Sequence, residues 1–321
     1  MKPPRLSRRE FAVMAAGAAA AAHCGISPLA AQSKSSLTAQ QLIDRIHQHA
    51  GAGWPRNASA GLKAGSPDTP VRGIVSTSMA TVEVLRQAVK SGANLIFTCE
   101  PTFFGVNEGA PQAPRTQAPV MAQAGGQPQG GPLRQQGVAS TDPILLAKKA
   151  LIDQNGLVIY RIGDHWTAGE DLSLALAAAM GWASNRSADD PLRYTIPARP
   201  LGGILADIRQ RLGARGGLRV IGDSRTVIQR VAVLPGLRPL PDLLKYLPQS
   251  DLLLLGESRD WEGPEYASDA DFAGLKKGYA QIGRVVSEDP GMAAFSTWVQ
   301  TFVKEVPVQT IPATDPFWRP A

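Results

Sequence analysis

The chain has 321 residues, of which 44% are apolar, and this is enough for one large or two ordinary domains with hydrophobic cores. Its formal net charge is +6, but the basic residues form no cluster, so we expect no nucleic-acid partner. Gly (32 residues) and Pro (26 residues) are frequent, which predicts many loops.

The first 31 residues have the pattern of an export signal. Basic residues precede a short apolar run from Ala12 to Ala22, and Leu29-Ala30-Ala31 offers a small-residue cleavage site before Gln32. The segment Ser7–Phe11 contains paired arginines and matches a twin-arginine signal. The apolar run is too short to span a bilayer, so no stable membrane anchor is expected after processing. We therefore predict a twin-arginine signal peptide at residues 1–31 and a periplasmic or secreted mature protein.

Loss of this segment changes the charge and the cysteine content of the chain. It removes four Lys/Arg and one Glu, so the formal net charge falls from +6 to +3. It also removes Cys24, which fits a lipoprotein site poorly because His23 precedes it and the expected leucine is missing. The mature chain keeps Cys99 alone, so it forms no internal disulfide and depends on packing for its stability.

The most informative stretch is a predicted strand–helix–strand unit. A β-branched run at Gly73–Val75 precedes an amphipathic helix that ends at Gly92, and the apolar strand Asn94–Phe97 follows. Such a unit favours a parallel sheet with a right-handed crossover, in which ligands gather at the carboxyl ends of the strands. Cys99 and Glu100 stand at one such end.

The remaining predicted elements also alternate between helix and strand. In the first half we expect helices at 37–50, 144–153 and 170–181 and a strand at 157–160. In the second half we expect helices at 201–212, 240–246, 267–277 and 292–302, and strands at 218–221, 230–234, 251–256, 279–282 and 306–311. Both halves alternate between helices and strands and place acidic residues after an apolar strand. We therefore predict an α/β fold of two similar lobes, at residues 32–193 and 194–321.

Other segments are predicted to connect or cover these elements. Residues 54–70 are predicted to be a connection and Pro235-Gly236 a turn. Residues 105–137, rich in Gln, Pro, Gly and Ala, are predicted to be an insertion at the mouth of the site, either a lid or a tolerated surface loop. His47 and His49 lie two apart on a predicted helix and so point in different directions, and we interpret both as facing solvent.

Ligand-type side chains follow several of the predicted strands. They are Cys99, Glu100, Asp164, His165, Glu257, Asp260, Glu262 and Glu288. Carboxylates, an imidazole and a thiolate are competent ligands for zinc, manganese or iron. Carboxylates that converge in one cleft repel one another unless a cation lies among them. Two ions about 3.5–4 Å apart would share a water and polarise a phosphate or amide oxygen of a small-molecule substrate.

Each of these residues also has an interpretation without a metal. A lone Cys at a strand end is commonly a small buried apolar residue, and acidic residues after strands often cap a helix or pair with Arg. Arg284 and Glu288, four apart at a predicted helix start, would form an ion pair. His165 beside Trp166 would serve as a hydrogen-bonded core histidine. The spacing alone leaves both interpretations open.

From about residue 37 to residue 320 the chain resembles the Nif-three-like dinuclear metal-centre proteins, also called GTP cyclohydrolase I type 2-like, and especially their bacterial branch with a His-Glu-Pro-Thr-Phe-aromatic pattern. The resemblance is carried by stretches that occur in the family's order: GLKAG at 61–65, TSMATVEVL at 77–85, CEPTFF at 99–104, DHW at 164–166, GESRDWEGPEYASDA at 256–270, GRVVSEDPGM at 283–292 and DPFW at 315–318. It implies two similar α/β lobes with a metal-type cleft between them and a homo-oligomer, commonly a hexamer.

The resemblance also implies where the metal ligands would lie. Matched by motif, the positions are Cys99 and Glu100, Asp164 with His165 as its alternative, Arg284 and Glu288. Two of them depart from the family pattern, because Cys99 and Arg284 both stand where the family has histidine. Cysteine binds soft metals, whereas arginine is not deprotonated in proteins and is no ligand.

The sequence is therefore compatible with two functions. One is a metal-binding, hydrolase-like protein with an altered site of one or two ions and an unknown substrate. The other is a metal-poor, non-catalytic binding or scaffold protein that retains the fold, with the positive charge of Arg284 balancing Glu288 and its neighbours.

Overall fold

The computed structural model describes residues 37–51, 60–105, 138–162, 170–213 and 217–317. The predicted signal peptide, nearly all of the predicted 105–137 insertion, Asp164 and His165 lie outside these ranges. Within them, no helix has both the length and the apolar character needed to cross a bilayer.

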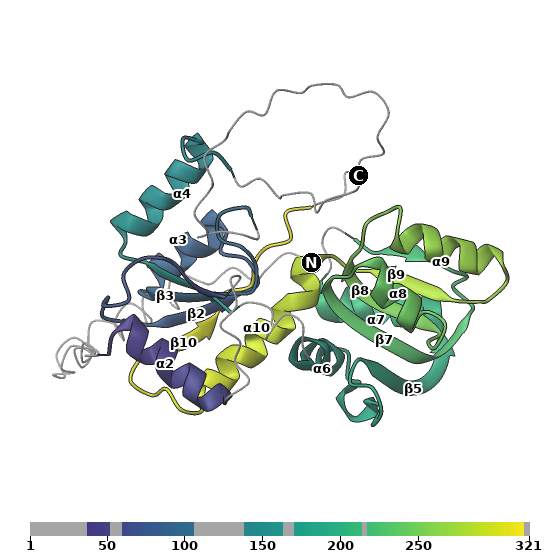
Figure 1. The fold of residues 1–321 in the computed structure, drawn as a ribbon. Helices are drawn as coiled ribbons and strands as arrows, with labels where there is room; N and C mark the ends of the chain where they lie inside the picture. The colour runs from purple at the N-terminus through teal and green to yellow at the C-terminus, as the bar shows by residue number, and fades with distance from the viewer. Residues whose placement is uncertain (1–36, 52–59, 106–137, 163–169, 214–216, 318–321) are drawn as a thin grey trace, which may run out of the picture. The chain divides into compact units, whose positions relative to one another are not determined.

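The first sheet is built around the predicted strand–helix–strand unit (Figure 1). Its strand order is β1-β4-β3-β2-β10. The strands are β1 (Gly61–Ala64), β2 (Ile74–Thr77), β3 (Leu95–Thr98), β4 (Val158–Arg161) and β10 (Val308–Thr310). All neighbours are parallel except β1, which runs antiparallel to β4. Every residue of β2, β3 and β4 is buried, as expected for central strands of a sheet covered on both faces.

The second sheet has the strand order β5-β7-β8-β9-β6. Its strands are β5 (Arg193–Pro200), β6 (Arg219–Ile221), β7 (Val227–Leu237), β8 (Leu252–Glu257) and β9 (Gly278–Gln281). The three central strands β7, β8 and β9 are parallel, and the edge strands β5 and β6 are antiparallel to their neighbours. The prediction of an α/β fold with two similar halves is thus confirmed.

Helices cover both faces of each sheet. They are α2 (Ala39–Ala50), α3 (Val82–Lys90), α4 (Pro143–Gln154), α6 (Glu170–Ala179), α7 (Leu201–Leu212), α8 (Leu240–Tyr246), α9 (Gly263–Phe272) and α10 (Arg284–Gln300). On the first sheet, α2 and α10 share a core on one face, and α3 and α4 share a core on the other. On the second sheet, α6 and α7 pack on one face and α8 and α9 on the other.

Local sequence explains where several helices begin and end. The Thr38 hydroxyl accepts a hydrogen bond from the Gln41 N–H, and the Thr38 N–H donates one to Gln41 Oε1, so a capping box starts α2. Asp142 caps α4 directly before Pro143, as the sequence predicts. Gly92, just beyond α3, has a φ of +80°, a conformation that favours glycine.

Four predicted boundaries were wrong. The Pro235-Gly236 pair is no turn but lies inside β7, where the register with β8 shifts between Leu234 and Leu237. The connection predicted at 54–70 contains β1, a short edge strand. Helix α9 runs from Gly263 to Phe272 rather than over 267–277.

The fourth correction concerns α10, which begins at Arg284 and not at Met292. Proline removes a helical hydrogen bond and usually ends a helix, so Pro290 would be expected to interrupt α10. Here α10 continues through Pro290 because side chains on several sides of the helix are buried. Met292 and Phe295 pack in the core beneath the first sheet, and Val286 packs in a core of the second sheet. Tertiary packing outweighs the local cost of the proline.

Gly256 permits a close approach of β7, β8 and the first turn of α10. A Cβ atom at this position would lie 2.5 Å from the carbonyl oxygen of Gly236 and 2.5 Å from Ser287 Oγ. We therefore expect Gly256→Ala to lower the free energy of unfolding by about 1–3 kcal/mol through overpacking. Urea unfolding followed by circular dichroism measures this.

Gly203→Ala in α7 is the matched control for Gly256→Ala. A Cβ atom there would meet only the flexible Arg199 guanidinium, at 3.0 Å. In a helix this change stabilises by about 0.5–1 kcal/mol. Equal urea midpoints for Gly256→Ala and the unsubstituted protein would contradict the proposed close approach.

Candidate functional site: an arginine among three glutamates

The Arg284 guanidinium contacts three carboxylates. Its Nη2 lies 2.5 Å from Glu100 Oε1, its Nη1 lies 3.4 Å from Glu257 Oε1, and its Nε lies 3.5 Å from Glu288 Oε1. Glu100 follows β3 of the first sheet, Glu257 ends β8 of the second sheet, and Glu288 lies one turn along α10. Each guanidinium nitrogen therefore has a carboxylate partner, and the partners come from both sheets. We call these four residues the Arg284 cluster.

Backbone interactions hold the glutamates of this cluster in place. After β3, the Glu100 N–H and the Thr98 hydroxyl both donate to the Ser78 carbonyl, at 3.0 Å each, and this fixes the turn that carries Glu100. In α10, Ser287 Oγ donates to the Arg284 carbonyl (2.7 Å) and accepts the Gly236 N–H (2.9 Å). The first turn of α10 is thus tied to β7, beside the end of β8.

Burial differs strongly within the cluster. Glu100 and Glu288 are 4% and 1% exposed, whereas the side chain of Glu257 is 39% exposed. Burial raises the pKa of Glu288 well above its usual 4.5, and the charge of Glu100 raises it further, against the opposing effect of Arg284. Among the described residues, Glu288 Oε2 has no hydrogen-bond partner. Glu288 therefore keeps its proton to a higher pH than an exposed glutamate does.

Arg284 keeps its positive charge in this setting. Partial burial alone would lower its pKa, but the charges of Glu100, Glu288 and Glu257 outweigh burial and raise it. The cluster is thus held together by a permanent cation that belongs to the chain itself.

These residues do not fit the pair of metal ions that the sequence resemblance implies. The space among the three carboxylates is taken by a guanidinium, which donates hydrogen bonds and has no lone pair for a metal. Within the described ranges, no three His, Cys, Asp or Glu side chains are grouped so that they could hold an ion. Asp164 and His165, two of the predicted ligands, lie outside those ranges.

Cys99 lies beside this cluster but belongs to the hydrophobic core. Its side chain is fully buried among core residues of the first sheet, and its Sγ lies 3.1 Å from Met292 Sδ. Burial, and then the charges of Glu288 and Glu100, raise the pKa of this thiol well above 9.0, so it stays protonated. A metal ligand would require the thiolate.

The other predicted acidic residues pair elsewhere. Asp260 accepts a hydrogen bond from Arg219 at 2.8 Å, with both side chains exposed, and Glu262 Oε1 lies 3.0 Å from Arg259 Nη1. The structure therefore brings Glu100, Glu257 and Glu288 together and leaves Asp260 and Glu262 in separate ion pairs. The predicted Arg284–Glu288 pair is confirmed.

One charged residue next to the cluster was not predicted from the sequence. Asp289 Oδ1 accepts a hydrogen bond from Ser78 Oγ at 2.6 Å, linking α10 to the end of β2. Burial raises its pKa to about 6, although hydrogen bonds from Ser78 and the Ala313 backbone oppose this. Its position after Glu288 and before Pro290 is the only signal in the sequence that could have suggested it.

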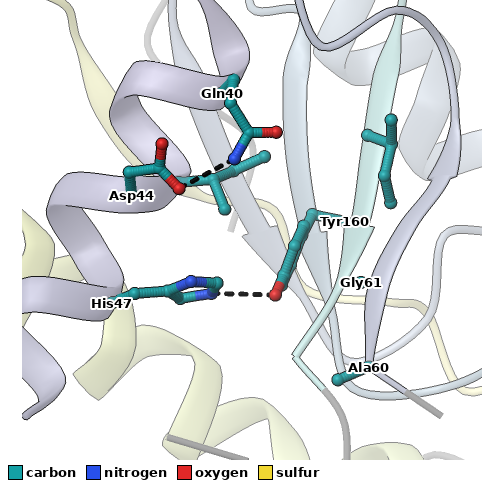
Figure 2. A pocket seen from close by; sticks show the side chains of 8 residues that line it. Gln40, Asp44, His47, Ala60, Gly61 and Tyr160 are labelled. Carbon is teal, nitrogen blue, oxygen red and sulfur yellow. Dashed lines mark hydrogen bonds between the residues drawn. The ribbon is translucent and has the colours of Figure 1, made fainter. Parts of the chain in front are cut away.

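A small pocket lies between α2, β1 and β4 (Figure 2), and no residue of the Arg284 cluster lines it. It has a volume of about 320 Å³, and Gln40, Asp44, His47 and Tyr160 contribute its polar side chains. His47 Nε2 and Tyr160 Oη share a hydrogen bond of 2.8 Å, and His47 is half-buried rather than fully exposed to solvent. The interpretation as solvent-facing is confirmed for His49, which is exposed. The partner of His47 comes from a distant strand, so local sequence could not show it.

Comparisons with known proteins identify the fold. No family model and no curated protein matches the chain. Among solved structures, the Staphylococcus aureus hypothetical protein SA1388 is similar with a TM-score of 0.65 and 15% identity, over 89% of this chain and 100% of that chain. A Bacillus cereus protein related to NIF3 is similar with a TM-score of 0.60 and 16% identity, over 88% and 99%. Reduced HcgD from Methanocaldococcus jannaschii is similar with a TM-score of 0.56 and 14% identity, over 85% and 97%.

These similarities define the class of protein by its architecture. The chain is an α/β protein with two five-stranded sheets, each covered by helices on both faces. More specifically, it has the fold of NIF3-related proteins, over nearly the full length of the solved structures.

The raised pKa of Glu288 predicts a pH-dependent stability. The folded state binds this proton more tightly than the unfolded chain, so stability falls as the pH rises above about 4.5 toward the folded-state pKa. Glu288→Gln imitates the protonated form and removes this loss. We expect the variant to gain stability relative to the unsubstituted protein as the pH increases, measured by urea unfolding between pH 4.5 and 8.

Glu83→Gln, at an exposed site on α3, is the control for Glu288→Gln. It should follow the pH profile of the unsubstituted protein. Parallel profiles for Glu288→Gln and the unsubstituted protein would show that Glu288 does not hold the proton.

Proposed function

We propose that this protein is a divergent member of the Nif-three-like family that acts as a binding protein without a resident metal. The observation that carries the proposal is the Arg284 guanidinium, in contact with Glu100, Glu257 and Glu288. A positive charge is needed where these carboxylates meet, and the side chain of Arg284 supplies it.

Electrostatics favours the guanidinium over an added ion. Two unit charges 4 Å apart interact by about 4 kcal/mol at an effective dielectric constant of 20, so a divalent ion at that distance from Arg284 would be repelled by about 8 kcal/mol. This repulsion cancels the attraction that one carboxylate at the same distance would supply, and the guanidinium already contacts all three carboxylates. The protonated thiol of Cys99 offers no compensating ligand in its present form.

The second candidate is a metal-binding, hydrolase-like protein with one ion of zinc, manganese or iron. It is favoured by the proximity of Glu100 and Glu288 and by the buried Glu288 Oε2, which has no hydrogen-bond partner among the described residues. Asp164 and His165 would complete this site. The ion would act as a Lewis acid toward a phosphate or amide oxygen of an unknown substrate.

Export and assembly are further proposals that rest on the sequence. The mature protein would begin at Gln32 in the periplasm or outside the cell, and N-terminal sequencing of the exported form tests this. Self-association, with a hexamer as the form that the family resemblance implies, is tested by light scattering.

Elemental analysis separates the two candidate functions. The mature protein is incubated with Zn²⁺ or Mn²⁺ and desalted, and its metal content is measured by plasma mass spectrometry. We expect well below one ion per chain, because the guanidinium excludes the ion. Arg284→His, which removes the fixed charge and adds an imidazole ligand, should retain more metal than the unsubstituted protein.

Glu83→Gln controls for loosely bound surface metal, since this exposed residue lies on α3. One ion per chain in the unsubstituted protein, lost on Glu288→Gln but not on Glu83→Gln, would refute the metal-free proposal and support the second candidate.

A further inference from the structure

A second cavity lies along another face of α10. Its volume is about 570 Å³, within the 300–1,000 Å³ typical of small-molecule sites. The ends of α6 and α7, the first half of α10 and the segment 310–315 form its walls. Arg284 and Glu288 do not line it, whereas Val285 and Asp289 do, so this cavity is separate from the Arg284 cluster.

Most of the cavity wall is apolar. Its apolar residues include Val285, Val286, Pro290, Ala293, Leu212 and Pro312. Burying an aliphatic group against such a wall contributes about 25 cal/mol per Å² of apolar surface removed from water. The cavity therefore suits a ligand with an aliphatic body.

Three charged side chains stand among these apolar residues. Arg211, in the last turn of α7, is exposed and has no hydrogen bond or ion pair within the described part of the chain. Asp289 and Asp315 line the same cavity from α10 and from the segment after β10. Asp289 Oδ1 accepts from Ser78 Oγ at 2.6 Å and Asp315 Oδ1 accepts from the Phe317 N–H at 3.0 Å, which orients both carboxylates.

The presence of one arginine and two aspartates in the cavity wall determines which charges a ligand should carry. A simple anion would be attracted by Arg211 but repelled by two carboxylates, and a simple cation would be attracted by the carboxylates but repelled by Arg211. A molecule with both an ammonium and a carboxylate group complements all three side chains. With an aliphatic body added, this is the chemistry of an apolar α-amino acid.

We propose that the cavity binds a free α-amino acid with an aliphatic side chain. Arg211 binds the carboxylate of the ligand, Asp289 and Asp315 bind its ammonium group, and the aliphatic side chain packs against Val285, Val286 and the neighbouring apolar residues. The site would give the binding protein a ligand without using the Arg284 cluster. Binding of an amino acid in this cavity does not depend on whether Arg284 or a metal ion balances the charge of the three glutamates. Metal analysis and ligand titration therefore test the two proposals separately.

Isothermal titration calorimetry of the mature protein with L-leucine and L-valine tests the proposal. We expect saturable binding of one molecule per chain. Leucinamide, which lacks the carboxylate, and 4-methylpentanoate, which lacks the ammonium group, should each bind about 10-fold or more weakly, since each loses a charge-assisted hydrogen bond. No saturable binding of either amino acid, or equal binding of leucine and leucinamide, would overturn the proposal.

Two pairs of exposed variants locate the binding to this cavity. Ala293→Trp fills the cavity and should abolish binding, whereas Ala294→Trp, one residue further along the exposed surface of α10 and outside the lining, should leave it unchanged. Arg211→Gln should weaken leucine binding about 10-fold or more while leaving leucinamide binding unaltered. Arg209→Gln, in the same exposed last turn of α7, is its control. Leucine binding that survives Ala293→Trp would show that the site lies elsewhere.

Discussion

The ion pairs of Arg284 with Glu100, Glu257 and Glu288 are the interaction on which this structure depends most. Glu100 and Glu288 are nearly buried, so their negative charges would repel each other, and removing them from water adds a further cost. One guanidinium offsets both effects because it has a donor for each carboxylate. Since Glu100 follows a strand of one sheet and Glu257 ends a strand of the other, the same side chain links the two halves of the fold.

The position of Arg284 is fixed by α10 and by its surroundings. The helix contributes buried side chains to cores of both sheets, which is why it persists through Pro290. At its first turn, Ser287 joins the backbone of α10 to Gly236, and the missing side chain of Gly256 lets the strands come close. The first turn of α10 is tightly packed, so the backbone of Arg284 is held in a fixed position. Arg284 therefore has a structural role that a flexible surface arginine would not have.

Much of the fold follows from local sequence. The strands β2, β3 and β8 begin with apolar runs at 74–75, 95–97 and 252–255, and the N-cap at Asp142 marks the start of α4 correctly. The edge strands β1 and β5 were not predicted, because they are partly exposed and carry polar residues, prolines or glycines. The Pro235-Gly236 pair was wrongly predicted to be a turn, and both there and at Pro290 the usual local effect of proline is overcome by tertiary packing.

The candidate site was predictable only in part. The rule that ligands gather at the carboxyl ends of parallel strands predicts the convergence of Glu100 and Glu257. That Arg284 would occupy the space between them, and that Cys99 would face Met292 instead, depends on the path of α10. The contact of His47 with Tyr160 likewise joins residues far apart in sequence, which periodicity does not reveal. Residue type showed that a cation was needed here and that Arg284 could provide it, whereas the tertiary structure showed which three carboxylates its guanidinium contacts.

A double-mutant cycle between Arg284 and Glu100 tests the central claim most directly. The free energies of unfolding are compared for Arg284→Gln, Glu100→Gln, the double variant and the unsubstituted protein, with and without EDTA. If Arg284 supplies the positive charge, Arg284→Gln destabilises, the two sites couple by roughly 1–3 kcal/mol, and EDTA changes nothing. Zero coupling together with a loss of stability in EDTA would contradict the account, because a metal ion would then be the cation that holds these carboxylates together.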